Sequence, residues 1–225
     1  MDTLIASILE KISTTTEPII IGISGHGAAG KTTLALSLIE TLGKHKVNYL
    51  NTDPYILDSS IRKYTTIEYD YIDTTHKFKM TACHPEAHFI PALERDLSMI
   101  RNGLLLKTFD VPYLPQTTML PEKSITIVEG MSVAFIDPEL LDLSIYLYTD
   151  DDTEWVRRTN RDVSERNTTL SYLTNSHAER RIQYTIFMHP FSKSFNIIVR
   201  QTITDFQIEK ITKKKKYQSS GQILN

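Results

Sequence analysis

The chain has 225 residues, 40% of them hydrophobic, which suits one globular domain over residues 1–210 followed by a polar and basic tail at 211–225. The 25 basic and 27 acidic residues are evenly mixed and leave a net charge of −2, so neither nucleic acid nor a membrane is the expected partner. The single cysteine, Cys83, excludes an internal disulfide, no apolar run approaches the ~20 residues of a membrane span, and the first residues lack a signal-peptide pattern. A reducing cytoplasm is therefore the expected compartment.

The chain begins with a predicted packing helix and a predicted buried strand. Apolar residues recur at helical spacing over residues 2–14, and an isoleucine-rich run follows over 19–23. The strand leads directly into a glycine-rich loop with the Gly-x-x-x-x-Gly-Lys-Thr pattern of a phosphate-binding loop, or P-loop. The residues assigned to it are Gly25, His26, Gly27, Ala28, Ala29, Gly30, Lys31, Thr32 and Thr33.

This loop is predicted to hold the phosphates of a nucleoside triphosphate. Its backbone amides converge on an anion, Lys31 reaches the outer phosphates, and the Thr32 hydroxyl ligates magnesium. A glycine-rich turn without a ligand is the alternative. The strand before the loop and the leucine-rich helical stretch after it, over 34–39, favour the nucleotide site.

A second strand, over residues 47–50, ends just before Asp53 and Pro54. The proline stops regular pairing and leaves Asp53 at the carboxyl end of the strand, where open α/β sheets bind their ligands. Residues 54–120 are expected to form an excursion on the acceptor side of the site. Within it, 55–82 has no clear period and is expected to be partly helical or hairpin-like, and apolar spacing predicts a helix over 85–100.

Three further strands are predicted over residues 124–130, 143–148 and 195–199, the first of them with Glu129 at its tip. Strands that alternate with helical segments favour a parallel sheet with helices on both faces. With the P-loop, this predicts an α/β fold of the P-loop NTPase type: a three-layer sandwich on a five-stranded parallel sheet, with a mobile lid.

Two acids are candidates for phosphoryl-transfer chemistry. Asp53 and Glu129 both end predicted strands at the edge where the P-loop opens, so both are expected to face one nucleotide. Either can bind magnesium, and Asp53 is favoured as the base that accepts the proton of the attacking hydroxyl. An acid after a strand is otherwise an ordinary turn or cap residue.

Four arginines fall within ten residues: Arg157, Arg158, Arg161 and Arg166. In a generic protein, the interleaved Asp162 and Glu165 would favour a salt-bridged surface helix. In a P-loop enzyme, the same segment is the expected lid, over about residues 157–190, which closes on phosphates and excludes water.

Two other clusters carry weaker signals. Cys83, His84 and His88 superficially suggest a metal site but lack a second pair of ligands. The run Lys213–Lys216 is short, and a solvated chain end is favoured over a nucleic-acid or lipid site.

Taken in order, these segments resemble the uridine kinase and phosphoribulokinase family of P-loop kinases over residues 18–205. The segment from Arg157 to Arg166 matches the family's Arg-Arg-x-x-Arg-Asp-x-x-Glu-Arg pattern at every fixed position and is the most family-specific part. Outside the P-loop and this segment, the likeness is carried by Asp53-Pro54-Tyr55, His84-Pro85-Glu86-Ala87, Phe109-Asp110 and Glu129-Gly130.

The resemblance implies an ATP-dependent or GTP-dependent kinase that uses Mg²⁺ and phosphorylates a hydroxyl of a small metabolite, foremost a nucleoside such as uridine or cytidine. Members often assemble, so a homo-oligomer is compatible with it. The implied catalytic residues are Lys31, Asp53, Arg158, Arg161 and Arg166. The implied metal ligands are Thr32, Asp53 and Glu129. The implied acceptor-binding residues are Tyr55, Cys83, His84, Phe109 and Arg166.

The departures from the family pattern fall on the acceptor side. Nucleoside-specific members carry an Asp where this chain has Cys83, and a thiol accepts hydrogen bonds from ribose hydroxyls more weakly than a carboxylate. The family's Tyr-Asp-Phe and following His become Phe109-Asp110-Val111 and Leu114, and an expected Arg is Thr168. A non-nucleoside acceptor, such as a pantothenate-like compound, a sugar or a sugar phosphate, stays open, as does a regulatory nucleotide-binding NTPase.

Overall fold

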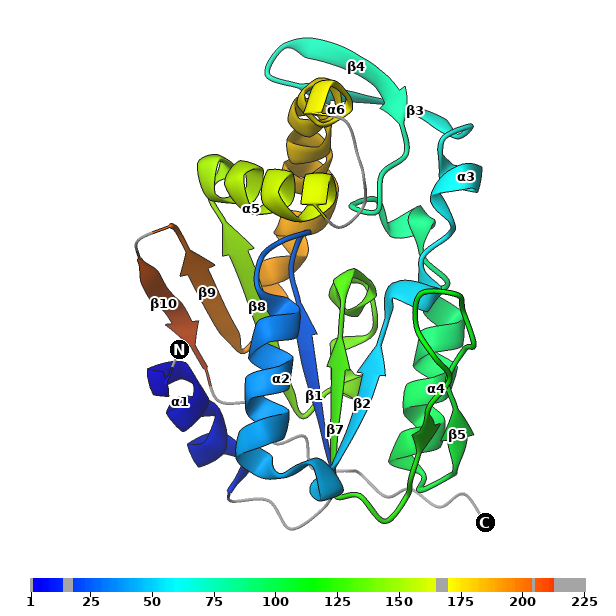
Figure 1. Cartoon of the computed structure of the whole chain (residues 1–225), viewed down its shortest axis with the longest axis vertical. Coiled ribbons are helices and arrows are strands. Elements are labelled where there is room, and N and C mark those ends of the chain that lie inside the picture. Colours follow the sequence, from blue (N-terminus) through cyan, green and yellow to red (C-terminus); the bar gives the residue numbers. More distant parts are fainter. Residues whose placement is uncertain (1, 14–17, 165–169, 204, 213–225) are drawn as a thin grey trace, which may run out of the picture.

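The computed structural model describes residues 2–13, 18–164, 170–203 and 205–212. Its centre is a sheet of six strands in the order β10-β9-β8-β1-β7-β2 (Figure 1). All neighbouring strands run parallel except the pair β9 and β10. The strands are β1 (Ile19–Ser24), β2 (Val47–Asn51), β7 (Ile125–Glu129), β8 (Leu143–Thr149), β9 (Ile197–Gln201) and β10 (Phe206–Ile211).

The predicted three-layer α/β sandwich is confirmed, and the number of strands is corrected from five to six. The sixth strand, β10, pairs antiparallel with β9 at one edge of the sheet. Its half-buried and exposed positions alternate, so it lacks the continuous apolar run that marks the central strands. β10 reaches Ile211, one residue past the expected boundary at 210, and the single-domain organisation over 1–210 stays a prediction.

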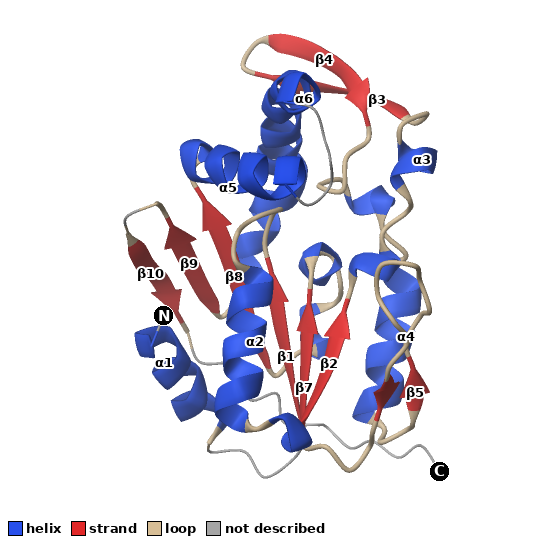
Figure 2. Ribbon diagram, in the orientation of Figure 1, coloured by secondary structure: helices blue, strands red, loops and turns tan. Residues whose placement is uncertain are grey.

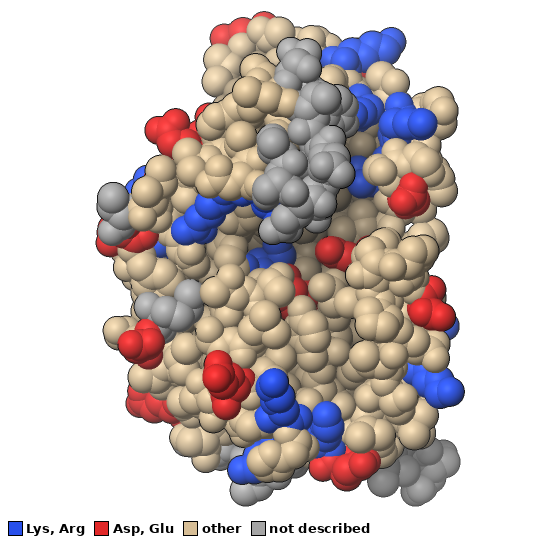
Figure 3. Space-filling view, viewed as in Figure 1, with Lys and Arg blue, Asp and Glu red and all other residues tan. Residues whose placement is uncertain are grey.

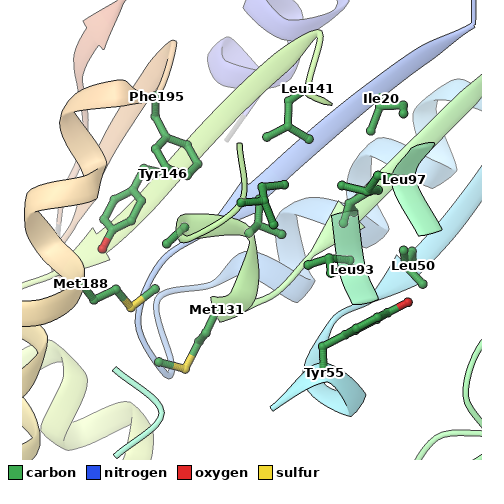
Figure 4. Close-up of a cluster of buried hydrophobic side chains, with 14 of the residues drawn as sticks. Ile20, Leu50, Tyr55, Leu93, Leu97, Met131, Leu141, Tyr146, Met188 and Phe195 are labelled. Carbon is green, nitrogen blue, oxygen red and sulfur yellow. The ribbon is translucent and has the colours of Figure 1, made fainter. Parts of the chain in front are cut away.

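Alternate residues of the central strands enter two separate cores, one on each face of the sheet. Ile21 and Ile23 of β1 pack beneath α1 (Asp2–Ile12) and α2 (Lys31–Leu42), whereas Ile20 points to the opposite face. That opposite core is filled from α4 (Ile90–Arg101) and from the helical segment 184–194 (Figures 2 and 4). The residues labelled there are Ile20, Leu50, Tyr55, Leu93, Leu97, Met131, Leu141, Tyr146, Met188 and Phe195.

Helix α4 starts later than the spacing of apolar residues predicts. Residues Pro85–Ala87 form one 3₁₀ turn, and His88 then pairs with Ile56 in an isolated β-bridge. Pro91 lies in the first turn of α4, where a missing N–H costs no hydrogen bond. The helix therefore begins at Ile90.

The excursion between β2 and β7 contains a short helix, α3 (Ser59–Arg62), and a hairpin of β3 (Thr66–Tyr71) and β4 (Thr74–Lys79). Ile72 and Asp73 occupy the hairpin turn with φ of 44° and 57°, the left-handed values of a tight two-residue turn. The hairpin-like prediction is confirmed. A second, two-residue ladder joins β5 (Leu106–Lys107) to β6 (Thr118–Met119).

The connection from β8 to β9 holds the segment predicted as a lid. It consists of α5 (Asp151–Ser164), α6 (Leu170–Gln183), a π-helical turn at Tyr184–Met188 and a 3₁₀ stretch at His189–Ser194. α5 and α6 lie above the carboxyl ends of the strands, and α6 meets the β3–β4 hairpin (Figure 1). None of the helices in the described ranges combines the length and apolar character that crossing a lipid bilayer requires.

Candidate active site

The P-loop leaves the carboxyl end of β1 in a conformation that requires glycine. Gly25 has φ of +142°, and a Cβ there would lie 1.9 Å from the carbonyl oxygen of Leu147. Gly30, with φ of +88°, immediately precedes the first residue of α2. The loop amides therefore lie at a helix N-terminus, where the helix dipole favours an anion.

Lys31 lies at the start of α2, and its ammonium group donates a hydrogen bond to the carbonyl of His26 at 3.0 Å. The lysine thus folds back over the loop from which it projects. A phosphate seated on the loop would offer it a charged acceptor in place of this neutral carbonyl.

Beside the loop, Glu129 is a buried carboxylate whose partners in this arrangement are hydroxyl groups. Its Oε2 accepts hydrogen bonds from Thr32 Oγ1 at 3.2 Å and from Tyr49 Oη at 2.8 Å. The Tyr49 hydroxyl stays protonated, because burial and the neighbouring Glu129 carboxylate raise its pKa. Two hydroxyls therefore hold the Glu129 side chain in place.

Asp53 lies just after the end of β2, and Glu129 is the last residue of the neighbouring strand β7. The two strands pair in register, with Asn51 opposite Glu129. The Asn51 side chain accepts a hydrogen bond from the Asp53 backbone N–H at 2.8 Å, which fixes the turn. Asp53 itself is exposed. The structure thus brings together Lys31, Thr32, Asp53 and Glu129 at one edge of the sheet, as the sequence predicts.

The oxygen atoms at this edge fit a magnesium ion. A threonine hydroxyl and a carboxylate in direct contact, with a second carboxylate in the turn that follows the adjacent strand, are ligands of the kind that Mg²⁺ binds in nucleotide sites. Thr32, Glu129 and Asp53 are the residues that would hold it.

The arginines of α5 divide into different environments. Arg157 reaches the P-loop, where its guanidinium Nη1 lies 3.4 Å from the Ala28 carbonyl and 3.1 Å from Gln201 Oε1. Arg158 is buried and pairs with Glu154 at 3.4 Å. Arg161 is half-buried, and Arg166 lies outside the described residues. The catalytic roles given to these residues stay predictions.

The residues predicted to bind the acceptor differ in how far their side chains are exposed to solvent. Tyr55 is fully buried, its hydroxyl donating to Asp96 and its ring packing edge-on against Phe109, which is half-exposed. Cys83 is also buried, and desolvation raises the pKa of its thiol to about 11. His84 packs its ring against Phe187. Of these side chains, Phe109 is the most exposed, and their roles in acceptor binding stay predictions.

The weak metal signal near His88 has a structural explanation. Its Nδ1 bonds to Ser132 Oγ at 2.8 Å and its Nε2 to the Ala82 carbonyl at 2.9 Å, so both ring nitrogens are occupied. Within the described ranges, no group of three histidine, cysteine or acidic side chains is arranged to hold a metal ion.

A hollow lies between the sheet-bearing body and the α5–α6 region, with basic and acidic side chains on its walls (Figure 3). Two residues near this edge were not predicted from the sequence. Tyr49 positions Glu129, and Gln201 anchors Arg157, one of the predicted lid arginines, which contacts the loop. Tyr49 and Gln201 carry no motif, and they meet the site only because β2 and β9 end beside it.

The family is decided by a sequence comparison. The family model described as "Phosphoribulokinase / Uridine kinase family" matches residues 20–208. The chain belongs to this family. It is therefore a phosphotransferase that acts on a hydroxyl group, as the motifs predicted.

Two relatives agree with this placement, and two solved structures share the fold. A uridine kinase of Lactobacillus helveticus is 30% identical over 195 residues, covering 81% of this chain and 86% of that enzyme, and one of Clostridium perfringens is 29% identical over 191 residues with the same coverage. Phosphoribulokinase from Rhodobacter spheroides aligns with a TM-score of 0.57 at 15% identity, over 83% of this chain and 71% of that one. A D-glycerate 3-kinase from Cryptococcus neoformans gives 0.58 at 11% identity, over 92% and 97%. These structural likenesses concern the fold.

Proposed function

We propose that this family member transfers the γ-phosphate of ATP, or of GTP, to a hydroxyl of a nucleoside such as uridine or cytidine. The observation that carries the proposal is the meeting of Lys31, Thr32, Glu129 and Asp53 at one edge of the sheet. The curated relatives of similar length are named uridine kinases, which favours a nucleoside acceptor.

In the proposed reaction, the P-loop amides and Lys31 bind the β- and γ-phosphates. Thr32 and Glu129, with Asp53, would hold a magnesium ion, which would supply positive charge to offset that of the phosphates. Asp53 is exposed toward solvent, free to approach an acceptor hydroxyl and accept its proton. Arg157 and the neighbouring arginines of α5 offset the negative charge on the transferred group.

The test is ADP release with ATP and Mg²⁺, with uridine, cytidine, pantothenate, sugars and sugar phosphates offered one at a time. Lys31→Ala serves as the blank. A nucleoside should raise turnover well above that blank. If no compound does so, while ATP is hydrolysed slowly at a constant rate, the chain is a regulatory NTPase and the proposal is wrong.

A second candidate is a kinase for an acceptor that is not a nucleoside. The observation that favours it is Cys83, a buried neutral thiol at the position where nucleoside-specific members carry an Asp. A thiol is a poor acceptor for the hydroxyls of a ribose. Turnover with pantothenate or a sugar, and none with uridine, would favour this candidate. Cys83→Asp would then be expected to improve turnover of uridine and not of the true acceptor.

A further inference from the structure

The P-loop residue His26 has a buried side chain, 1% exposed, with both ring nitrogens bonded. Nε2 lies 2.9 Å from the backbone nitrogen of Thr149, the last residue of β8, and Nδ1 lies 2.8 Å from the Gly27 carbonyl. A backbone N–H only donates, so Nε2 accepts and the ring proton lies on Nδ1. Burial lowers the pKa of this ring to about 4, so the imidazole is neutral at physiological pH.

The imidazole lies where α5 and α6 approach the loop. Glu154 of α5 places its Oε2 3.4 Å from Nδ1, and the same oxygen accepts a hydrogen bond from Arg181 of α6 at 2.8 Å. The ring of Tyr184 lies edge-on to the imidazole at 4.6 Å, and Lys31 donates to the His26 carbonyl. Burial opposes ionisation of Glu154, but the His26 ring in its protonated form and the guanidinium groups of Arg181 and Arg158 outweigh it and lower the pKa of this carboxyl.

Helix α5 contacts the P-loop at a second point on the same face. Arg157 follows Glu154 by three residues, which places the two side chains one above the other on a helix. Glu154 approaches His26, and Arg157 approaches the Ala28 carbonyl. A displacement of α5 would therefore alter both contacts at once. A change in the P-loop conformation would likewise alter the position of α5.

We propose that His26 is a positioning residue that couples the P-loop to α5 and α6, so that nucleotide binding at the loop and the placement of the α5 arginines depend on each other. The inference rests on the proposed function only in requiring that the loop bind a nucleoside triphosphate. It does not depend on the acceptor. Without the imidazole, the loop would lose its attachment to the end of β8 and would be less organised for phosphate.

Three substitutions separate the two bonds of the ring. His26→Ala removes both and leaves the Thr149 N–H buried without its acceptor. His26→Gln places an amide oxygen near the position of Nε2 and restores that acceptor. His26→Asn offers a polar group near Nδ1 only. Tyr184→Phe is the matched control, because it removes a hydroxyl bonded to His189 and keeps the ring that touches His26.

The chain carries its own reporter for α5. Trp155 is the single tryptophan, follows Glu154 directly and contacts His177 of α6 edge-on at 5.0 Å. Its emission therefore reports on the α5–α6 contact. The experiment titrates each full-length variant with ATP and Mg²⁺, measures the dissociation constant by calorimetry and records the change in Trp155 emission at saturation. Circular dichroism checks that each variant is folded.

In the wild type and in Tyr184→Phe, ATP should bind and change Trp155 emission. His26→Ala should weaken ATP binding about tenfold and lose most of the emission change, whereas His26→Gln should bind within about threefold of wild type and keep it. If the Ala variant does not fold, His26→Asn serves as the variant expected to show the loss.

Two results would overturn the inference: wild-type affinity and wild-type emission change in the loss variant, or equal loss in His26→Gln and the loss variant. An absent Trp155 response in the wild type on ATP binding would overturn it as well. A wild type that binds ATP with the expected response and phosphorylates no acceptor would contradict the proposed function alone.

Discussion

Replacing Tyr55 with Phe separates a structural role of this motif residue from a role in acceptor binding. The Tyr55 hydroxyl donates to Asp96 Oδ2 at 2.5 Å, and Asp96 is 2% exposed. A hydrogen bond to a charged group contributes about 1.5–3 kcal/mol, and Phe keeps the ring that packs against Phe109. We therefore expect a loss of about 2 kcal/mol in the free energy of unfolding. For a chain of this size, that lowers Tm by roughly 4–8 °C.

Thermal unfolding followed by circular dichroism measures this change, and the KM of the acceptor is measured on the same samples. The structure predicts a lower Tm with an unchanged KM. Asp96→Asn is the matched partner variant, and the double variant should lose less than the sum of the single losses, because both remove the same bond. A Tm within about 1 °C of wild type, together with a KM raised severalfold, would refute the structural interpretation and assign Tyr55 to the acceptor.

Other substitutions test the donor side and the buried histidines. Asp53→Asn should keep ATP affinity and lower kcat by about 10²-fold; near-normal turnover would move the base role to another group, with Glu129 the next candidate. Arg157→Ala should weaken ATP binding, and Arg157→Lys should not fully restore it, because an ammonium group that takes the place of Nη1 between the Ala28 carbonyl and Gln201 lacks the other N–H donors of a guanidinium; calorimetry measures both, and full rescue by Lys would contradict this. Burial lowers the pKa of His26 and of His88 from 6.5 to about 4, so the unfolded chain binds protons in this range that the folded chain does not. The free energy of unfolding should therefore fall as the pH drops from 6.5 to 4, by up to about 3 kcal/mol per histidine, and His88→Gln should flatten this fall in urea unfolding; an unchanged slope would contradict it.

The central strands were predictable because each is an apolar run that ends in a turn residue. β1, for example, is buried along its whole length and enters the P-loop directly. β10 was not predicted, because this edge strand alternates polar with apolar residues and has no continuous apolar run. Its strand conformation depends on pairing with β9. α4 began late because the pairing of His88 with Ile56 takes precedence over apolar spacing.

The donor side of the site was predictable from local motifs, because a P-loop and strand-end acids lie in fixed relation to a parallel sheet. Contacts between segments far apart in the chain could not be predicted from motifs. Arg157 meets Gln201 44 positions away in the chain, and Tyr49 meets Glu129 across 80. Motif position also says nothing about which way a side chain turns, and Tyr55 turns into the core toward Asp96.

The β3–β4 hairpin and α6 are joined by a set of side-chain bonds. Tyr69 donates to Glu179, and Gln183 donates to Tyr69 and accepts from Thr81. Two segments far apart in the chain therefore form one hydrogen-bonded unit above the carboxyl ends of the strands. If α6 closes on a bound nucleotide, as the predicted lid would, we expect the hairpin to move with it, so that closure over the donor would also reposition the acceptor side.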